Sequence, residues 1–350
     1  MEVGQLGNDL QNTKMNFSHP ILIIGFGSIG RRHTNNLLSL TKSNLIIYTN
    51  RKNIKKTEFI NHSKNKNRIK ILNDFKKCLN EKPKICFICN ETNLHIDFAM
   101  KLAKEKMDIF IEKPLSHSMK NISSLQSIVE QNKKILMVGC NFRFYPPIQK
   151  IKQLISKKFI GNIISVQSEN NSFLPDWHPS EDYRNNYAAK DSKGGGVTLT
   201  QIHELDFLTW IFGNHKKIHS LVGKFSNLKI TSDDLSVSII ELKNKIIVEL
   251  HLDYFSRPFY KRIKIRGTNG IIYWNSKQNS IKIFDNKKEK WSIINVSDNY
   301  SLNKKSVNRM YVDELKYFLE HISSRKQPMN NLNEAIPILK TALIIKSSHK

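Results

Sequence analysis

The chain of 350 residues is long enough for one large domain or two of ordinary size. Its composition, 39% hydrophobic and 25% charged, supports a folded core and excludes wholesale disorder. No run approaches the roughly 18 apolar residues of a membrane span, and residues 1–20 lack the apolar segment of a secretory signal. We therefore expect a soluble, cytoplasmic protein with no membrane partner.

The net charge is +26, from 56 basic and 30 acidic residues. Such an excess can attract nucleic acid or anionic metabolites. The lysines, however, are spread along the whole chain, and the densest basic stretch, Arg51 to Lys70, lies where a surface helix and loop are expected. This distribution favours a solvated surface, so no nucleic-acid partner is expected, and nucleic-acid binding is the weakest alternative.

Four cysteines are too few and too clustered for a disulfide framework. Cys86 and Cys89 have the spacing of a zinc or redox motif, but they lie in an apolar run typical of a buried strand. Residues three apart on a strand point to opposite faces, so the two sulfur atoms would not converge on one ion. We expect core cysteines and no metal site.

Residues 1–17 carry no periodic pattern and are predicted to form an N-terminal extension. From there to residue 140, short apolar runs alternate with amphipathic segments, which predicts βαβ units and a parallel sheet. This pattern predicts an α/β domain with a parallel sheet over residues 18–142. The predicted strands are residues 21–27, 44–50, 84–90, 107–114 and 134–140, and the predicted helices are residues 28–40, 95–106 and 122–131.

The pattern changes after Pro146 and Pro147, and residues 143–350 are predicted to form a second, α+β domain. Its sequential strands indicate a mostly antiparallel, open sheet, whose free face we expect to support a homo-oligomer. The fold class is thus α/β with an added α+β domain. The predicted strands are residues 163–170, 218–225, 235–242, 245–254, 262–267 and 271–275; helices are predicted at 148–156, from the triple glycine to Gly213, and at 310–319 and 333–346.

The motif Gly25-x-Gly27-x-x-Gly30 follows a buried strand and opens a helix. In this context the glycines predict dinucleotide binding: a tight turn, close approach of the pyrophosphate, and close packing of helix on strand. The first helical residues, Ser28 and Ile29, would present backbone amides to the phosphates. Residues 18–142 are therefore predicted to form a dinucleotide-binding Rossmann domain.

The end of the second strand bears on the choice of cofactor. An acid here would bind the ribose hydroxyls of NAD, but the sequence is Thr49-Asn50-Arg51. Arg51 could pair with the 2′-phosphate of NADP, which favours NADP. The alternative is a solvated Arg51, with Thr49 or Asn50 bound to an NAD ribose.

Glu112-Lys113-Pro114, together with GFGSIGRRH (25–33) and GGGVTLTQIHELD (194–206), resembles the Gfo/Idh/MocA oxidoreductases. The resemblance runs from about Pro20 to the C-terminus and includes CNETNLH (89–95), NFRFYPP (141–147) and RGTNG (266–270). It implies an NAD(P)-dependent oxidoreductase. By this resemblance the cofactor site includes Asn90, Thr92, His95, Glu112 and Lys113, and the substrate site includes Arg143 and Tyr145.

Lys113 has a chemical reason to be catalytic. It lies at the carboxyl end of a predicted parallel strand, where ligands bind in open α/β sheets. Its ammonium could bind a reacting hydroxyl and stabilise the developing alkoxide. Glu112 would orient it.

His203 is the second catalytic candidate, and it would also touch the substrate. Near a helix start the dipole favours the neutral imidazole, which accepts a proton from a carbinol. In the family that the sequence resembles, an aspartate lies three or four residues before this histidine; here Leu199 and Thr200 stand there. Either Thr200 hydrogen-bonds in place of the aspartate, or the chemistry rests on Lys113 and His203 alone.

A polar and aromatic loop precedes this helix and resembles that of family members linked to nucleotide-sugar and surface-polysaccharide metabolism. Such residues commonly bind carbohydrate, although a plain surface loop is the alternative for each of them. The candidate substrate-binding residues here are Trp177, Tyr183, Arg184 and Lys190.

The main hypothesis is an NAD(P)-dependent dehydrogenase that transfers a hydride between nicotinamide and a carbinol or keto carbon of a sugar, nucleotide sugar or cyclitol. The missing aspartate motivates a second class, a non-catalytic or regulatory dinucleotide-binding protein. A third alternative is a lyase or glycosidase of the same family that retains its NAD.

Overall fold

The computed structural model describes residues 14–51, 54, 63–278, 280–296 and 307–348. The chain divides into two compact units, residues 1–89 and 90–350. The domain boundary expected after residue 142 stays a prediction. Most of the predicted N-terminal extension lies outside the described residues, but Met15 is fixed: its backbone N–H donates to Leu40 O at 2.9 Å.

The first unit contains four parallel strands in the order β3-β2-β1-β4. All four residues of β1 and of β4 are buried, as expected for strands covered on both faces. The strands predicted at 21–27, 44–50 and 84–90 and the helix at 28–40 are confirmed. The elements are β1 (Ile21–Ile24), α1 (Ser28–Leu40), β2 (Leu45–Tyr48), β3 (Ile69–Leu72), α2 (Phe75–Asn80) and β4 (Ile85–Ile88).

Two elements of the first unit were not predicted, β3 and α2. β3 is four residues long, and α2 is a short helix whose N-terminus is capped by the Asp74 carboxylate, which accepts from Lys76 N–H at 2.8 Å. Much of the helix and loop expected over Arg51–Lys70 lies outside the described residues.

The second unit begins with the parallel pair β5 and β6. In both units the strand neighbours agree with the order 3-2-1-4-5-6 of a doubly wound dinucleotide-binding sheet. The C-terminal part of the chain contacts these strands: Asn330, just before α9, donates from Nδ2 to Val138 O at 2.7 Å, and the Phe318 ring of α8 packs edge-on against Phe110. The elements are α3 (His95–Lys104), β5 (Asp108–Glu112), α4 (Ile122–Gln131), β6 (Leu136–Gly139), α8 (Asn308–Ser324) and α9 (Leu332–Ser347).

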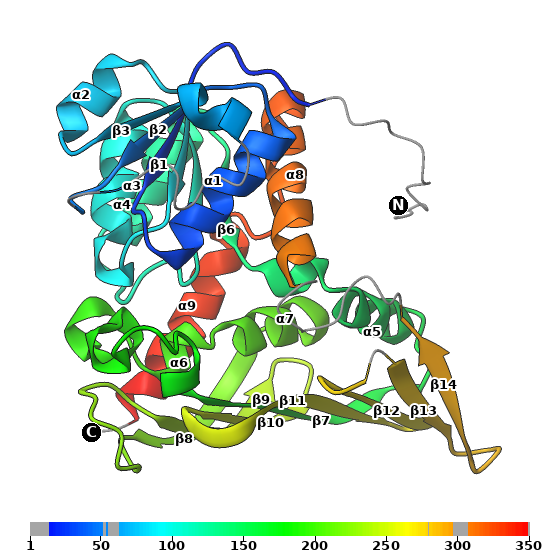
Figure 1. Cartoon of the computed structure of the whole chain (residues 1–350). Helices are drawn as coiled ribbons and strands as arrows, with labels where there is room; N and C mark the ends of the chain where they lie inside the picture. Colours follow the sequence, from blue (N-terminus) through cyan, green and yellow to red (C-terminus); the bar gives the residue numbers. More distant parts are fainter. Residues whose placement is uncertain (1–13, 52–53, 55–62, 279, 297–306, 349–350) are drawn as a thin grey trace. The chain divides into compact units, whose positions relative to one another are not determined.

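An eight-stranded sheet occupies the rest of the second unit, in the order β14-β13-β12-β11-β7-β10-β9-β8. Its neighbours are antiparallel except for β7 and β10, which confirms the mostly antiparallel sheet. In Figure 1, α5, α6 and α7 lie over one face of this sheet. The elements are α5 (Pro146–Ser156), β7 (Ile163–Phe173), α6 (Val197–Thr200), α7 (His203–Phe212), β8 (His215–Gly223), β9 (Leu235–Leu242), β10 (Ile247–Asp253), β11 (Phe255–Gly267), β12 (Gly270–Asn275), β13 (Ser280–Asp285) and β14 (Lys290–Asn295).

The single helix predicted up to Gly213 is divided into α6 and α7. Gln201, between them, has a backbone outside the helical range (φ −96°, ψ 28°). Its side-chain amide donates instead to Ser172 Oγ at 3.0 Å and Asp253 O at 3.1 Å. The break places His203 at the first position of α7.

Within the described part of the chain, none of the helices combines the length and apolar character that a membrane crossing needs.

Candidate active site

The glycine turn after β1 has the geometry of a phosphate-binding turn. Gly25 adopts φ +93°, and a Cβ on Gly30 would lie 2.2 Å from Gly25 O, so only glycine permits this close packing. A Cβ on Gly27 would meet nothing within 4 Å. No side chain caps α1, so the amides of its first turn, including Ser28 and Ile29, have no side-chain capping partner. These residues fit a dinucleotide pyrophosphate.

The end of β2 forms a small turn. Thr49 is buried, and its Oγ1 accepts from Arg51 N–H at 3.2 Å. Asn50 and Arg51 are exposed. The exposed guanidinium is compatible with both the NADP prediction and a solvated surface role.

The segment that follows β4 contains three predicted cofactor residues. Asn90 carries a buried Oδ1 without a partner among the described residues, an acceptor that a bound ligand could satisfy. Thr92 is buried. His95 is buried as well, with Nδ1 2.9 Å from Pro114 O and Nε2 3.2 Å from Asn90 O. His95 thus joins this segment to the Lys113-Pro114 turn, which indicates a positioning role.

The same segment packs against the triple glycine. A Cβ on Gly194 would lie 2.9 Å from the Cβ atoms of Thr92 and His117, and Lys193 Nζ pairs with Glu91 Oε1 at 2.5 Å. The predicted cofactor segment and the start of the predicted catalytic helix are therefore in contact.

Asp233 fixes the start of α6, which has no side-chain cap of its own. Its Oδ2 accepts from Thr198 N–H at 2.9 Å, and its Oδ1 accepts from Lys346 Nζ at 2.6 Å. Gly196 has φ +102°, and a Cβ there would lie 1.9 Å from Asp233 Oδ1. This glycine is required for the buried carboxylate to reach the helix.

Lys113 follows β5, and its ammonium donates to the backbone carbonyl of Thr200 at 2.7 Å. The Glu112 carboxylate is buried and accepts from the Lys113 backbone N–H at 3.2 Å, so it stabilises the turn that carries the lysine. Lys113 therefore lies beside Thr200, the last residue of α6. Thr200 precedes His203 by three residues.

The hydroxyl of Thr200 has two hydrogen-bond partners in the structure. It is buried and donates to Gly196 O at 2.6 Å, while the Tyr254 hydroxyl donates to it. The hydroxyl keeps one acceptor lone pair, so its replacement of the missing aspartate stays a prediction. Thr200 contributes its main-chain carbonyl, which holds the ammonium of Lys113.

His203 is partly exposed, and its ring lies 5.1 Å from the Phe142 ring. Its Nδ1 is buried without a partner among the described residues. Burial and the nearby ammonium groups of Lys113 and Lys261 lower the pKa of His203 well below its ordinary value. The imidazole is therefore neutral near pH 7, the form that accepts a proton.

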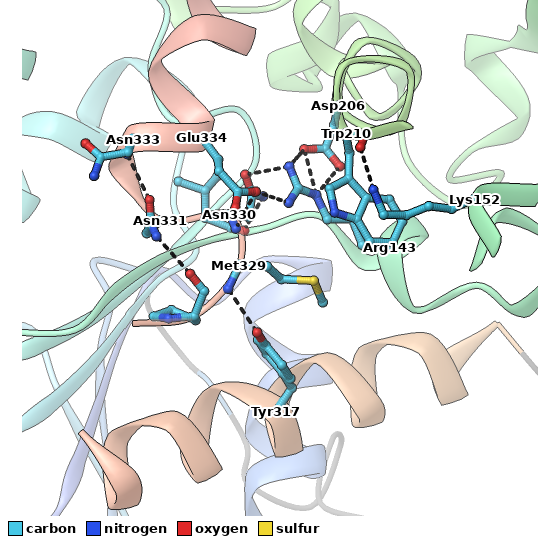
Figure 2. Close-up of polar contacts among 12 residues, drawn as sticks. Arg143, Lys152, Asp206, Trp210, Tyr317, Met329, Asn330, Asn331, Asn333 and Glu334 are labelled. Carbon is cyan, nitrogen blue, oxygen red and sulfur yellow. Dashed lines mark hydrogen bonds and ion pairs between the residues drawn. The ribbon is translucent and has the colours of Figure 1, made fainter. Parts of the chain in front are cut away.

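Arg143 lies in a buried network rather than an open pocket (Figure 2). Its guanidinium binds Asp206 bidentately, with Nη2 2.8 Å from Oδ1, and also contacts Glu334 and Asn330. This geometry contradicts a direct substrate contact and gives Arg143 a structural role between the 3-10 turn at 141–144, α7 and α9. Tyr145 is also buried, with its ring edge-on to Trp274, so it too belongs to the core.

The predicted loop residues have separate surroundings. The Trp177 ring packs edge-on against the Tyr254 ring, with the ring centres 5.3 Å apart. Tyr254 is the residue whose hydroxyl contacts Thr200. The Tyr183 hydroxyl accepts from Lys229 N–H at 3.1 Å, and Arg184 is exposed and pairs with Asp182 of its own loop at 2.7 Å. Lys190 is partly exposed. The structure thus joins only Trp177 to the Lys113–His203 cluster.

Sequence reasoning missed three residues of this cluster: Glu204, Tyr254 and Lys261. Lys261 alternates along β11 with Ile263 and Ile265, both of which are buried, and this period of two is a signal for an inward-facing lysine.

Comparison with known proteins gives consistent results. The model of the oxidoreductase family with an NAD-binding Rossmann fold matches residues 20–140, and that of the GFO/IDH/MocA C-terminal domain matches residues 148–273. A myo-inositol 2-dehydrogenase of Thermotoga maritima is 24% identical over 87% of this chain and 89% of its own length.

Two solved structures share the fold. A levoglucosan dehydrogenase in complex with NADH has a TM-score of 0.81 at 15% identity, covering 96% of this chain and 97% of its own. A UDP-N-acetylglucosamine 3-dehydrogenase from Acidithiobacillus ferrooxidans has a TM-score of 0.72 at 16% identity, covering 95% of this chain and 98% of its own.

Proposed function

Because the chain belongs to the Gfo/Idh/MocA oxidoreductase family, we propose that it is an NAD(P)-dependent dehydrogenase of a sugar, nucleotide sugar or cyclitol. The reaction interconverts a carbinol and a ketone. The named relatives, which are dehydrogenases of inositol, levoglucosan and a UDP-sugar, support this substrate class.

The observation that carries the proposal is the arrangement of Lys113 and His203. The Lys113 ammonium is held by Thr200 O, and a neutral imidazole follows at the start of α7. An ammonium stabilises the oxygen of a carbinol as its proton leaves, and a neutral imidazole accepts that proton. In the reverse direction the same two groups return the proton to a ketone.

The cofactor, when bound, supplies the hydride acceptor or donor. In the first unit the glycine turn would hold the pyrophosphate, and Asn50 and Arg51 are exposed at the end of β2. In the second unit the segment from Asn90 to His95 offers the unpartnered Asn90 Oδ1. The NAD-binding family model and the NADH complex of a relative support NAD(H).

The preference for NADP stays a proposal that rests on the exposed Arg51 and the lack of an acid at the end of β2. Arg51→Glu would repel a 2′-phosphate and should weaken NADP binding while leaving NAD binding nearly unchanged. Calorimetric titration of the wild type and of Arg51→Glu with each cofactor measures this. Equal affinities of the two proteins for NADP would remove Arg51 from the site.

We also propose a homo-oligomer that buries the free face of the eight-stranded sheet, and a cytoplasmic location. Leu221 on β8 is 73% exposed and lies opposite Val237 of β9, with Ile239 two residues further along. Apolar side chains gathered on a sheet face are typical of a subunit interface. A monomer by light scattering would contradict this part of the proposal.

Cofactor reduction tests the enzymatic function. The purified chain is mixed with NAD or NADP and with myo-inositol, levoglucosan and UDP-N-acetylglucosamine, and the absorbance of reduced nicotinamide is followed. Turnover by the wild type, lost in Lys113→Met, is the expected result. Tight cofactor binding without turnover over a wide panel would support a non-catalytic dinucleotide-binding protein instead.

A further inference from the structure

Lys261 is a buried lysine in the middle of β11, only 2% exposed. Its ammonium forms an ion pair with Glu204 of α7, and Glu204 also accepts from Asn170 Nδ2 at 3.1 Å. Burial lowers the pKa of Lys261, whereas the Glu204 carboxylate opposes this and favours the charged form. The pair therefore holds a fixed cation in the interior of the second unit.

The Phe142 ring links this cation to His203. The ammonium of Lys261 is 3.7 Å from the centre of the Phe142 ring, and the His203 ring is 5.1 Å from that same ring. Phe142 fixes both groups, since the aromatic face attracts the ammonium and the ring also packs against the imidazole.

The charges around the imidazole are unequal. The ammonium groups of Lys113 and Lys261 both lower the pKa of His203, and Thr200 places no carboxylate beside it. The acids on its own helix are each matched by a partner. The charged groups concerned are Lys113 after β5, Lys261 on β11, Glu204 and Asp206 on α7, and Arg143, which pairs with Asp206.

We propose that Lys261 is a positioning residue for His203, and that with Glu204 and Phe142 it holds a cation beside the imidazole that opposes its protonation and keeps it a proton acceptor. The inference rests on the proposed dehydrogenase function. Lys261, a residue of the sheet, would thus control the protonation of His203. The lowered pKa of His203, caused by burial, Lys113 and Lys261, agrees with this geometry.

A purely structural ion pair is the competing explanation, because a buried Lys–Glu pair needs no catalytic reason. The two explanations differ in one measurable quantity, the pH at which His203 titrates. If the pair is only structural, removing Lys261 lowers stability and leaves the titration midpoint of His203 unchanged. If Lys261 acts on the imidazole, removing it raises that midpoint.

The test is the titration of His203 by NMR in the folded, full-length chain with isotope-labelled histidine, assigned by its absence in His203→Asn. In Lys261→Met the midpoint should rise by about one pH unit, since a like charge nearby has been removed. Lys261→Arg keeps the charge and should keep the midpoint close to wild type. Lys261→Met with Glu204→Gln removes the pair without leaving a bare carboxylate, and should also raise it.

The matched control is Lys216→Met, which removes a lysine paired with Glu241 at 2.8 Å on β8 of the same sheet and should not change the titration. Where a substrate from the panel is oxidised, the acid limb of kcat/KM should move upward with the midpoint. An unchanged midpoint in both Lys261→Met variants would overturn the inference. A wild type without turnover for any substrate would instead refute the proposed function, because the NMR titration needs no substrate.

Discussion

Lys113 and His203 are predicted to act on one substrate oxygen, so their loss should not add. Lys113→Met keeps the apolar stem and removes the ammonium, which should lower kcat by roughly 10²–10³-fold. His203→Asn should lower it by about 10²–10⁴-fold. The kcat of the double variant, measured by steady-state kinetics, should be only slightly below that of the less active single variant.

Cofactor affinity is the control for these variants, and it should change far less than kcat because neither group binds the pyrophosphate. Turnover near wild type in His203→Asn would assign the histidine to packing and leave proton transfer to another group.

Thr200→Val separates the role of the Thr200 hydroxyl from that of its main-chain carbonyl. The main-chain carbonyl that holds Lys113 remains, but the Tyr254 hydroxyl loses its acceptor in a buried site. We expect stability to fall by about 1–3 kcal/mol, measured by urea unfolding, with kcat reduced less than in Lys113→Met. A loss of kcat as large as that of Lys113→Met in a stable variant would support a catalytic hydroxyl.

Single residues were predicted well where a motif fixes their chemistry and poorly where folding decides their partners. Lys113 could be placed at a strand end from its motif alone. The direction of the Thr200 hydroxyl depends on Tyr254, which is 54 positions away along the chain. Arg143 resembles a substrate residue in sequence, but only the packing of α9 shows that its donors are occupied.

Among the elements, α7 depends on the Arg143 network for its attachment to the 3-10 turn at 141–144. Arg143→Met leaves the Asp206 carboxylate buried and unpaired, so the free energy of unfolding should fall by about 3–5 kcal/mol. Arg184→Met, at an exposed pair, should leave it nearly unchanged. Equal small effects in denaturant titrations would contradict the structural role of Arg143.

In the glycine turn before α1, a substitution can test cofactor binding with little effect on folding. A side chain at Gly27 enters open space, so Gly27→Asp should fold with a near-wild-type melting temperature. Its carboxylate would repel the pyrophosphate at the helix N-terminus, and dinucleotide binding by calorimetry should be lost. Gly27→Ala should bind more weakly than wild type but better than Gly27→Asp. Unchanged affinity in the aspartate variant would remove this turn from the cofactor site.

Elements with a strong pattern were predicted, and weaker ones were not. The apolar runs of β1, β4 and β6 are buried throughout, and a buried run has a clear signal. By contrast, β14 is exposed over most of its length, so it lacks the alternation that marks a strand. The break between α6 and α7 follows from contacts of the Gln201 side chain with distant strands, which no local pattern records.

For the whole molecule, the sequence predicted both sheets, but the contacts divide the chain after residue 89. The reason lies at the C-terminal end of the chain: α8 and the segment before α9 contact β5 and β6, so these strands belong with the second unit. Lys113 and His203 accordingly lie in one unit, together with Lys261 and the segment from Asn90 to His95.

The most direct test of the account is the fate of the hydrogen on the reacting carbon. A substrate of the panel is labelled with deuterium at its carbinol carbon and incubated with the chain and oxidised cofactor, and the products are analysed by mass spectrometry. We predict one deuterium in the reduced nicotinamide and a ketone product without label. Deuterium that returns to a carbohydrate product, with no net reduced cofactor, would contradict a dehydrogenase and identify a lyase or glycosidase that retains its cofactor.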